Sequence, residues 1–151
     1  MKRIAIFLVC VLLAVGIIPR PVLADTGSGM VLVSETVTYV DETTYYIECI
    51  YVPEVCPSSD VRTGSKTAQF VYKGSSIFTV SVTGQFTYDG RAAKATSASG
   101  RVNVHIAGAS LNSKNAYTSG ASAIASASVS YLGTTLNKTV TLTCDANGNL
   151  S

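Results

Sequence analysis

The sequence predicts an all-β fold, an antiparallel β-sandwich of about seven or eight short strands that follows a cleaved signal peptide. A partly open β-barrel is the alternative architecture. Three observations lead to this prediction. Apolar residues recur at every second position in several segments, turn residues separate these segments at fairly regular intervals, and no segment has the apolar periodicity of an amphipathic helix. The chain has 151 residues, which is enough for one modest domain with its own core.

The first 24 residues have the three parts of a signal peptide. Met1-Lys2-Arg3 is basic, residues 4–18 are apolar, and Val22-Leu23-Ala24 ends in a small residue, so we expect cleavage between Ala24 and Asp25. The apolar run of about 15 residues is shorter than the roughly 20 that a membrane-spanning helix needs. The sequence therefore predicts a secreted chain, residues 25–151, with no stable membrane anchor after cleavage.

Two strands are expected in an N-terminal hairpin region, residues 25–60. They cover residues 31–40 and 45–52, and Asp41-Glu42-Thr43-Thr44 joins them. The second of these strands is apolar on both faces, which is typical of a central strand. A polar connector is expected at residues 57–66, before the main β-rich region, residues 61–151.

Further strands in the main region are expected at residues 67–72, 78–88, 102–106, 121–131 and 140–144, with turns at Lys73-Gly74 and Asp89-Gly90. Residues 121–131 alternate alanine with mostly serine. A helix is the rival interpretation of this segment because alanine favours helices, but the serines and the β-branched Ile124 and Val129 favour a strand. On a strand these alanines would let two layers approach closely. The predicted core consists of Phe70, Phe78, Val80, Val82, Phe86, Val102, Val104, Ile106, Val140 and Leu142.

The net charge of the mature chain is close to zero. Three of the eleven basic residues lie in the signal peptide, which leaves eight basic and nine acidic residues after cleavage. Binding to nucleic acid or to an anionic membrane depends on clustered lysine and arginine. We therefore expect neither kind of partner.

Three cysteines remain after cleavage: Cys49, Cys56 and Cys144. Export makes disulfides possible, and one cysteine must be left over. Proximity favours Cys49–Cys56, which would face each other in a hairpin centred on Val52-Pro53, whereas the chain-entropy model favours a long loop closed by Cys144. Cys49 and Cys56 are the preferred pair, with Cys144 as the alternative partner. The spacing of the cysteines and the single histidine does not fit a zinc site, so no metal is expected.

A resemblance covers roughly residues 66–151. The segment 82–90 (VTGQFTYDG), residues 94–97 and the ending 140–151 (VTLTCDANGNLS) resemble a group of small exported proteins of clostridia-type Gram-positive bacteria. The resemblance implies export and a β fold, and it implies no activity. These relatives carry a cysteine near the position of Ala95 that would pair with Cys144. Its absence here makes Cys49 or Cys56 a substitute partner for Cys144.

Catalytic patterns are missing from the sequence. His105 is the single histidine and falls at an outward strand position, where a solvent-facing role is expected. Most of the carboxylates fall in turns, where they bond their own backbone. No zinc-protease, nucleophile-elbow or phosphate-loop motif is present. We therefore expect no enzymatic activity and no cofactor.

The expected function is that of a secreted, non-catalytic structural or binding module of the extracellular space or cell envelope, with no identified ligand. One alternative is a carbohydrate- or protein-recognition module in which Tyr45, Tyr46 and Tyr51 form the binding surface, with cell-wall glycan or another extracellular protein as the partner. A second alternative is a secreted toxin-like or inhibitory effector.

Overall fold

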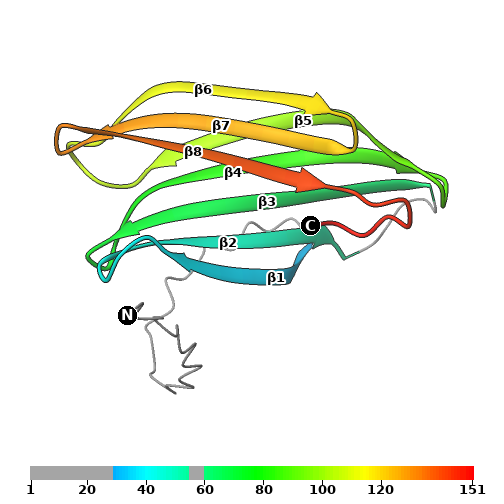
Figure 1. Ribbon diagram of the computed structural model, residues 1–151, viewed down its shortest axis with the longest axis horizontal. Coiled ribbons are helices and arrows are strands. Elements are labelled where there is room, and N and C mark those ends of the chain that lie inside the picture. The colour runs from blue at the N-terminus through cyan, green and yellow to red at the C-terminus, as the bar shows by residue number, and fades with distance from the viewer. Residues whose placement is uncertain (1–28, 55–59) are drawn as a thin grey trace, which may run out of the picture.

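Residues 29–54 and 60–151 are described in the computed structural model, and they form eight strands in two antiparallel sheets (Figure 1). Sheet A has five strands in the order β1-β2-β3-β4-β5, and sheet B has three in the order β6-β7-β8. Each strand pairs with the next in its sheet, so both sheets are meanders. The strands are β1 (Met30–Tyr39), β2 (Thr44–Pro53), β3 (Val61–Tyr72), β4 (Ser75–Tyr88), β5 (Ala93–Val104), β6 (Ser110–Ser119), β7 (Ser122–Tyr131) and β8 (Thr134–Thr143).

The prediction of an all-β antiparallel sandwich is confirmed. The two sheets pack face to face and do not close into a barrel (Figure 1). The alanine-rich segment 121–131 forms strand β7, so the helical interpretation is wrong. The expected turns at Lys73-Gly74 and Asp89-Gly90 are also present, and positive φ angles of 49° at Lys73, 77° at Gly74 and 81° at Gly90 make the backbone reverse there.

Four strand predictions are wrong because the predicted strands are too short or absent. Strand β3 begins at Val61, inside the expected polar connector, and β5 begins at Ala93 instead of residue 102. Strand β8 begins at Thr134 instead of residue 140. Strand β6 was not expected at all. Its side chains are exposed except for that of Ala116, which is half-buried, so the sequence has no apolar alternation there.

The core lies between the sheets, as alternation predicts. Seven of the ten predicted core residues are buried, while Val102, Val104 and Ile106 are partly buried and pack against the others. The β4 residues Phe78, Val80, Val82 and Phe86 line its sheet A side. Ala123, Ala125 and Ala127 of β7 and Val140 and Leu142 of β8 line its sheet B side.

Small residues bring the sheets together where β7 crosses β4 and β5. A Cβ atom placed on Gly84 of β4 would lie 2.7 Å from the Cβ of Ala123, and one on Gly100 of β5 would lie 3.0 Å from the Cβ of Ala116 and 3.2 Å from that of Ala125. A real Cβ has no room at Gly84. The alanine face of β7 therefore does what the sequence predicts and lets the two layers approach closely.

Sheet B is narrower than sheet A and packs mainly over β3, β4 and β5. Strands β1 and β2 extend past it at one side of the molecule (Figure 1). The chain end is held on the covered side: Leu150 forms a β-bridge with Cys144, and its side chain contacts the position where Gly64 of β3 has no Cβ. Of the two strands of the N-terminal hairpin, β1 is exposed along nearly its whole length and β2 is partly buried.

Three turns are stabilised by aspartate. The side chains of Asp41, Asp89 and Asp145 accept hydrogen bonds of 2.8–2.9 Å from backbone amides two to four residues later. The Asn149 side chain also donates to Asp145 at 2.8 Å. These hydrogen bonds favour the charged carboxylate and hold the pKa of each group below its ordinary value of 3.8. The carboxylates in these turns therefore accept hydrogen bonds from nearby backbone amides, as their sequence positions predict.

Replacing Gly84 with valine is expected to destabilise the fold, because the new side chain would collide with Ala123 and force the sheets apart. We expect the free energy of unfolding to fall by about 1–3 kcal/mol. Thr87→Val is the matched control, since Thr87 is exposed on the same strand, β4. Urea denaturation measures both variants, and equal stability of the two would contradict the close approach of the sheets.

Candidate functional site

The N-terminal hairpin exposes an apolar edge strand. In the described residues, six of the nine exposed large hydrophobic side chains lie on β1 or directly after it. They are Val31, Leu32, Val33, Val37, Tyr39 and Val40, and they are 41–67% exposed. Long apolar edge strands are uncommon in isolated soluble domains because they template pairing with other chains. This strand is therefore the principal candidate contact surface.

The backbone at this edge is available for pairing. The Val40 amide donates to the Thr44 carbonyl at 2.9 Å, so Val40 bonds toward β2. Hydrogen-bonded and non-hydrogen-bonded pairs alternate along an antiparallel ladder. The amide and carbonyl groups of Tyr39, Val37 and Glu35 consequently point to the free edge, where a further strand could add.

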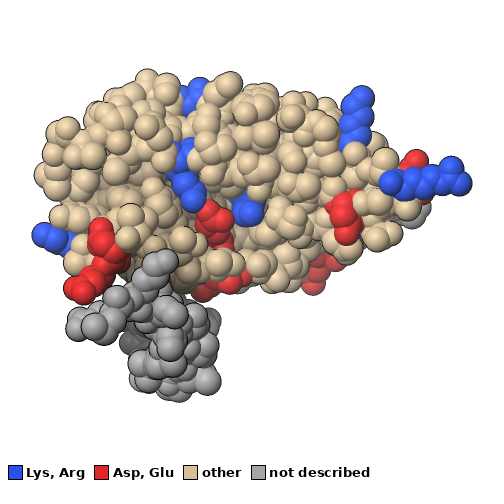
Figure 2. All heavy atoms as spheres, viewed as in Figure 1, with Lys and Arg blue, Asp and Glu red and all other residues tan. Residues whose placement is uncertain are grey.

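Charge is distributed unevenly between the hairpin and the rest of the fold. Residues 29–54 contain five acidic residues, Glu35, Asp41, Glu42, Glu48 and Glu54, and no lysine or arginine. Residues 60–151 contain eight basic and three acidic residues. Figure 2 shows most of the acidic side chains along the side of the molecule formed by β1 and β2. The near-zero net charge thus conceals an acidic edge on a basic body.

The structure does not bring the three predicted binding tyrosines onto one surface. Tyr45 and Tyr51 lie on the outer face of sheet A, whereas Tyr46 points toward sheet B and packs against Phe70 with ring centroids 5.0 Å apart. Tyr45 instead pairs with Tyr39, with ring centroids 5.4 Å apart and an interplanar angle of 46°. Burial, with the neighbouring Cys49 as a second cause, raises the pKa of Tyr51 to about 12. An aromatic surface exists, but it consists of Tyr39 and Tyr45, with Tyr51 further along β2.

The cysteines occupy different environments. Cys49 is buried on the outer face of β2, between its cross-strand neighbours Glu35 and Thr67, and burial raises its pKa. Cys144 is buried in the core beyond β8, and burial raises its pKa as well. Within the described ranges Cys49 and Cys144 are not bonded to each other, so the alternative bridge from Cys49 to Cys144 is not formed. Strand β2 continues through Pro53, which rules out the tight hairpin at Val52-Pro53.

Cys56 lies outside the described residues, as do Ala24 and Asp25. The Cys49–Cys56 pair and the cleavage site therefore stay predictions.

A charged cluster joins the hairpin to sheet B. The Lys138 ammonium of β8 donates to Glu48 Oε1 of β2 at 2.6 Å and lies 4.1 Å from the centre of the Tyr46 ring. Lys66 Nζ of β3 is 4.0 Å from Glu48 Oε2. All three charged side chains are mostly buried. The charge of Glu48 is therefore paired with lysines inside the fold, whereas Glu35 and Glu42 are exposed at the edge.

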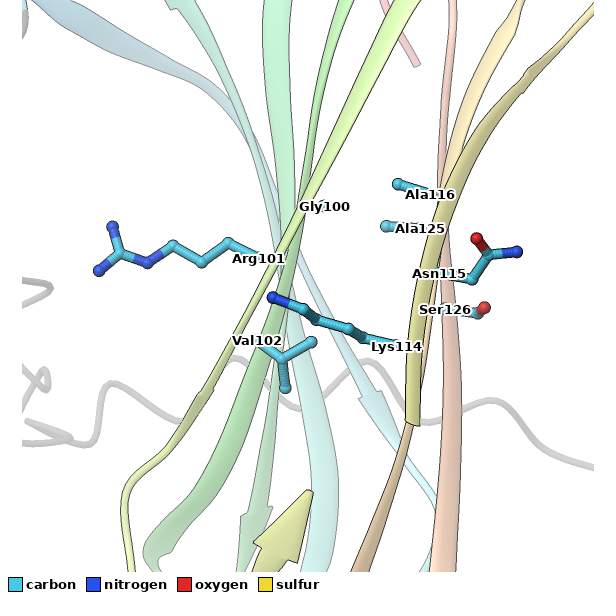
Figure 3. Close-up of a pocket in the computed structure, with 8 residues that line it drawn as sticks. All are labelled: Gly100, Arg101, Val102, Lys114, Asn115, Ala116, Ala125 and Ser126. Atoms are coloured by element: carbon cyan, nitrogen blue, oxygen red, sulfur yellow. The ribbon is translucent and has the colours of Figure 1, made fainter. Parts of the chain in front are cut away.

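A shallow cavity of about 180 Å³ opens between β5 and β6. Figure 3 shows Lys114 reaching from β6 toward β5, while Arg101 points away from the cavity. Gly100, Val102, Ala116 and Ala125 supply a small apolar floor. The cavity is therefore a gap beside the β5 edge into which Lys114 brings a positive charge.

His105 lies directly after β5 and is exposed, and its Nε2 is 2.8 Å from Thr79 Oγ1 on β4. The outward position predicted from the sequence is thus where the residue lies. In the described ranges, no carboxylate is recorded in contact with this imidazole. No group of three histidine, cysteine or acidic residues within those ranges could hold a metal ion, and no helix there is long and apolar enough to cross a bilayer.

Comparison with known proteins adds no information on function: no protein-family model, no curated protein and no solved structure matches the chain.

Replacing Lys138 with alanine is expected to lower the free energy of unfolding by about 1–2 kcal/mol, because it removes a cation–π contact and leaves the mostly buried Glu48 without its close partner. Lys94→Ala is the control, since Lys94 is an exposed lysine of β5 and its loss should change stability by less than about 0.5 kcal/mol. Chemical denaturation measures both. Equal effects would show that the cluster does not stabilise the fold.

Proposed function

We propose that the processed chain is a secreted, non-catalytic structural or binding module of the extracellular space or cell envelope, and that it makes contact through the β1 edge. The observation that supports the proposal most directly is the run of exposed apolar side chains on β1. Such a run beside unpaired backbone groups resembles a strand-addition site, in which main-chain hydrogen bonds give affinity and side chains give selectivity.

The acidic character of the hairpin supports the same surface. Five negative charges accompany the apolar strand, and four of them lie outside the buried Glu48 cluster. A partner with basic residues beside an exposed strand would meet both features. Electrostatic complementarity of this kind speeds association and excludes acidic partners.

Expression of the full chain in a Gram-positive host, followed by fractionation, tests export and contact together. We expect the exported protein to begin at Asp25 by intact mass and to be retained in the washed envelope fraction. Val37→Lys combined with Tyr39→Lys should release it into the medium several-fold more readily, because the charges break up the apolar edge.

Leu132→Lys is the matched control, because Leu132 is 72% exposed at the turn between β7 and β8, away from β1. This variant should be retained like the wild type. A chain that stays in the cytoplasm with its leader, or equal release of all variants, would refute the proposal.

Carbohydrate recognition is a second candidate function, favoured by the ring pair of the exposed Tyr39 and the partly buried Tyr45 on the outer face of sheet A. Aromatic rings on a sheet surface can stack on sugars and dominate binding energy at a small interface. On a glycan array, Tyr45→Ala should weaken binding about tenfold, which is ~1.4 kcal/mol, and Tyr51→Ala should weaken it less.

Tyr117→Ala on β6 is the control for the array, since Tyr117 is exposed on the other sheet. An array on which the wild type binds no glycan, or on which Tyr45→Ala and Tyr117→Ala behave alike, would exclude this second function.

A further inference from the structure

We propose that the partner of the β1 edge is a second copy of this chain, and that β1 of one copy adds to β5 of the next to extend sheet A head to tail. The inference deepens the proposed function and rests on it, because it names the partner of the same surface. Contacts of this heterologous kind do not close on themselves when the strands simply continue, so they build an open chain of copies.

The first support is a comparison of β1 with the two edge strands of sheet B. Strand β6 carries an inward-pointing lysine, Lys114, opposite Ala127, and β8 carries Lys138 opposite the same residue. Inward charges of this kind protect edges from pairing. Strand β1 has only a bulge at Val33 and the outward Glu35, together with the apolar side chains that favour pairing.

The second support is that the β5 edge has open space beside it. Within the described part of the chain, the Ala95 amide donates to the Gly120 carbonyl at 2.9 Å, which covers the beginning of β5. Further along β5, the His105 amide donates to Ile77 of β4. Amides along an antiparallel strand point alternately to its two sides, so those of Val102 and Gly100 point away from β4, to the outer edge. The cavity between β5 and β6 lies against these two residues (Figure 3).

The third support is directional. Every pairing in sheet A is antiparallel, so β1 and β5, at opposite edges of the five strands, run in the same direction. A second copy displaced along the sheet therefore meets β5 with a parallel β1 and keeps its outer face on the same side. Sheet B of the incoming copy does not cover its own β1, so it does not obstruct the pairing of that β1 with β5 of the preceding copy.

The fourth support is that opposite charges lie in the same cross-strand row at the two edges of sheet A. One cross-strand row runs over the outer face of sheet A from one edge to the other, and its members are Glu35, Cys49, Thr67, Ser81 and Arg101. Continuing the sheet in this register places Glu35 of the incoming copy beside Arg101 of the preceding one. Lys94 and Arg91 add further positive charge near this edge. A symmetric pairing of two β1 strands would instead bring two wholly acidic hairpins together.

Sedimentation velocity of the processed protein, extracted from the washed envelope fraction and purified, tests the proposal. The wild type is expected to form a concentration-dependent series of assemblies that shortens at high salt, because the contact is partly ionic. Glu35→Lys and Arg101→Glu should each weaken association at least about tenfold, since each puts like charges side by side. The double variant carrying both changes should regain assembly, because the pair is restored with its signs exchanged.

Both residues are exposed, so neither change threatens the fold, and circular dichroism checks this. Lys73→Glu in the turn between β3 and β4 is the control for charge reversal and should assemble like the wild type. Val37→Pro, which removes an edge amide of β1, should abolish assembly without relying on charge.

Three results would overturn the proposal: a wild type that stays monomeric at all concentrations, an Arg101→Glu variant that assembles normally, or a double variant that fails to recover. An assembly insensitive to Arg101 but sensitive to Glu35 would indicate symmetric β1 pairing. Envelope retention that depends on β1 in a strictly monomeric protein would leave the proposed function standing while removing this inference.

Discussion

The close approach of the two sheets along a seam of alanine and glycine determines the rest of the architecture. Where Ala123 and Ala125 of β7 meet Gly84 of β4 and Gly100 of β5, no larger side chain fits between the layers. Protein interiors are packed to the density of organic crystals, so a contact of this kind fixes the position of one layer on the other. Since β7 is the central strand of sheet B, fixing it over β4 and β5 also fixes where sheet B ends.

That position leaves β1 uncovered and places β2 at the margin of the core, which Ile50 and Tyr46 reach from β2. Lys138 of sheet B contacts the hairpin at Glu48 and at the Tyr46 ring. The hairpin is therefore attached by its ladder to β3, by the packing of Ile50 and Tyr46 against the core and by one charged cluster, while β1 has a strand partner on one side alone among the residues that the structure describes. The large apolar side chains of β1 are only partly buried by the described part of this chain, which is why a further contact for them is sought in another molecule.

Alternation was sufficient to predict the architecture where one face is buried. Phe78, Val80, Val82 and Phe86 mark β4 plainly, and alternating alanines mark β7 against their own helix propensity. Alternation of apolar and polar residues does not predict a strand where neither face is buried. Nine of the ten side chains of β6 are exposed, so its sequence shows no such alternation. The beginning of β3 was missed for a related reason, because Arg62, Thr63 and Lys66 are polar residues on a half-covered strand, and composition alone classed them as a connector.

The candidate site was harder to predict, because it depends on which strand lies at the edge. The sequence identified β1 as a strand, but the same apolar residues would be core if another strand covered them. The charge separation was visible in principle: no lysine or arginine occurs between Arg20 and Arg62. Its meaning depends on the topology, which places Glu35 and Arg101 in one row at opposite edges. A sheet whose two edges carry opposite charges in the same row, and whose second layer stops short of one edge, has complementary ends. Neither property alone would determine which edges associate. Together they favour pairing of the β1 edge of one copy with the β5 edge of the next.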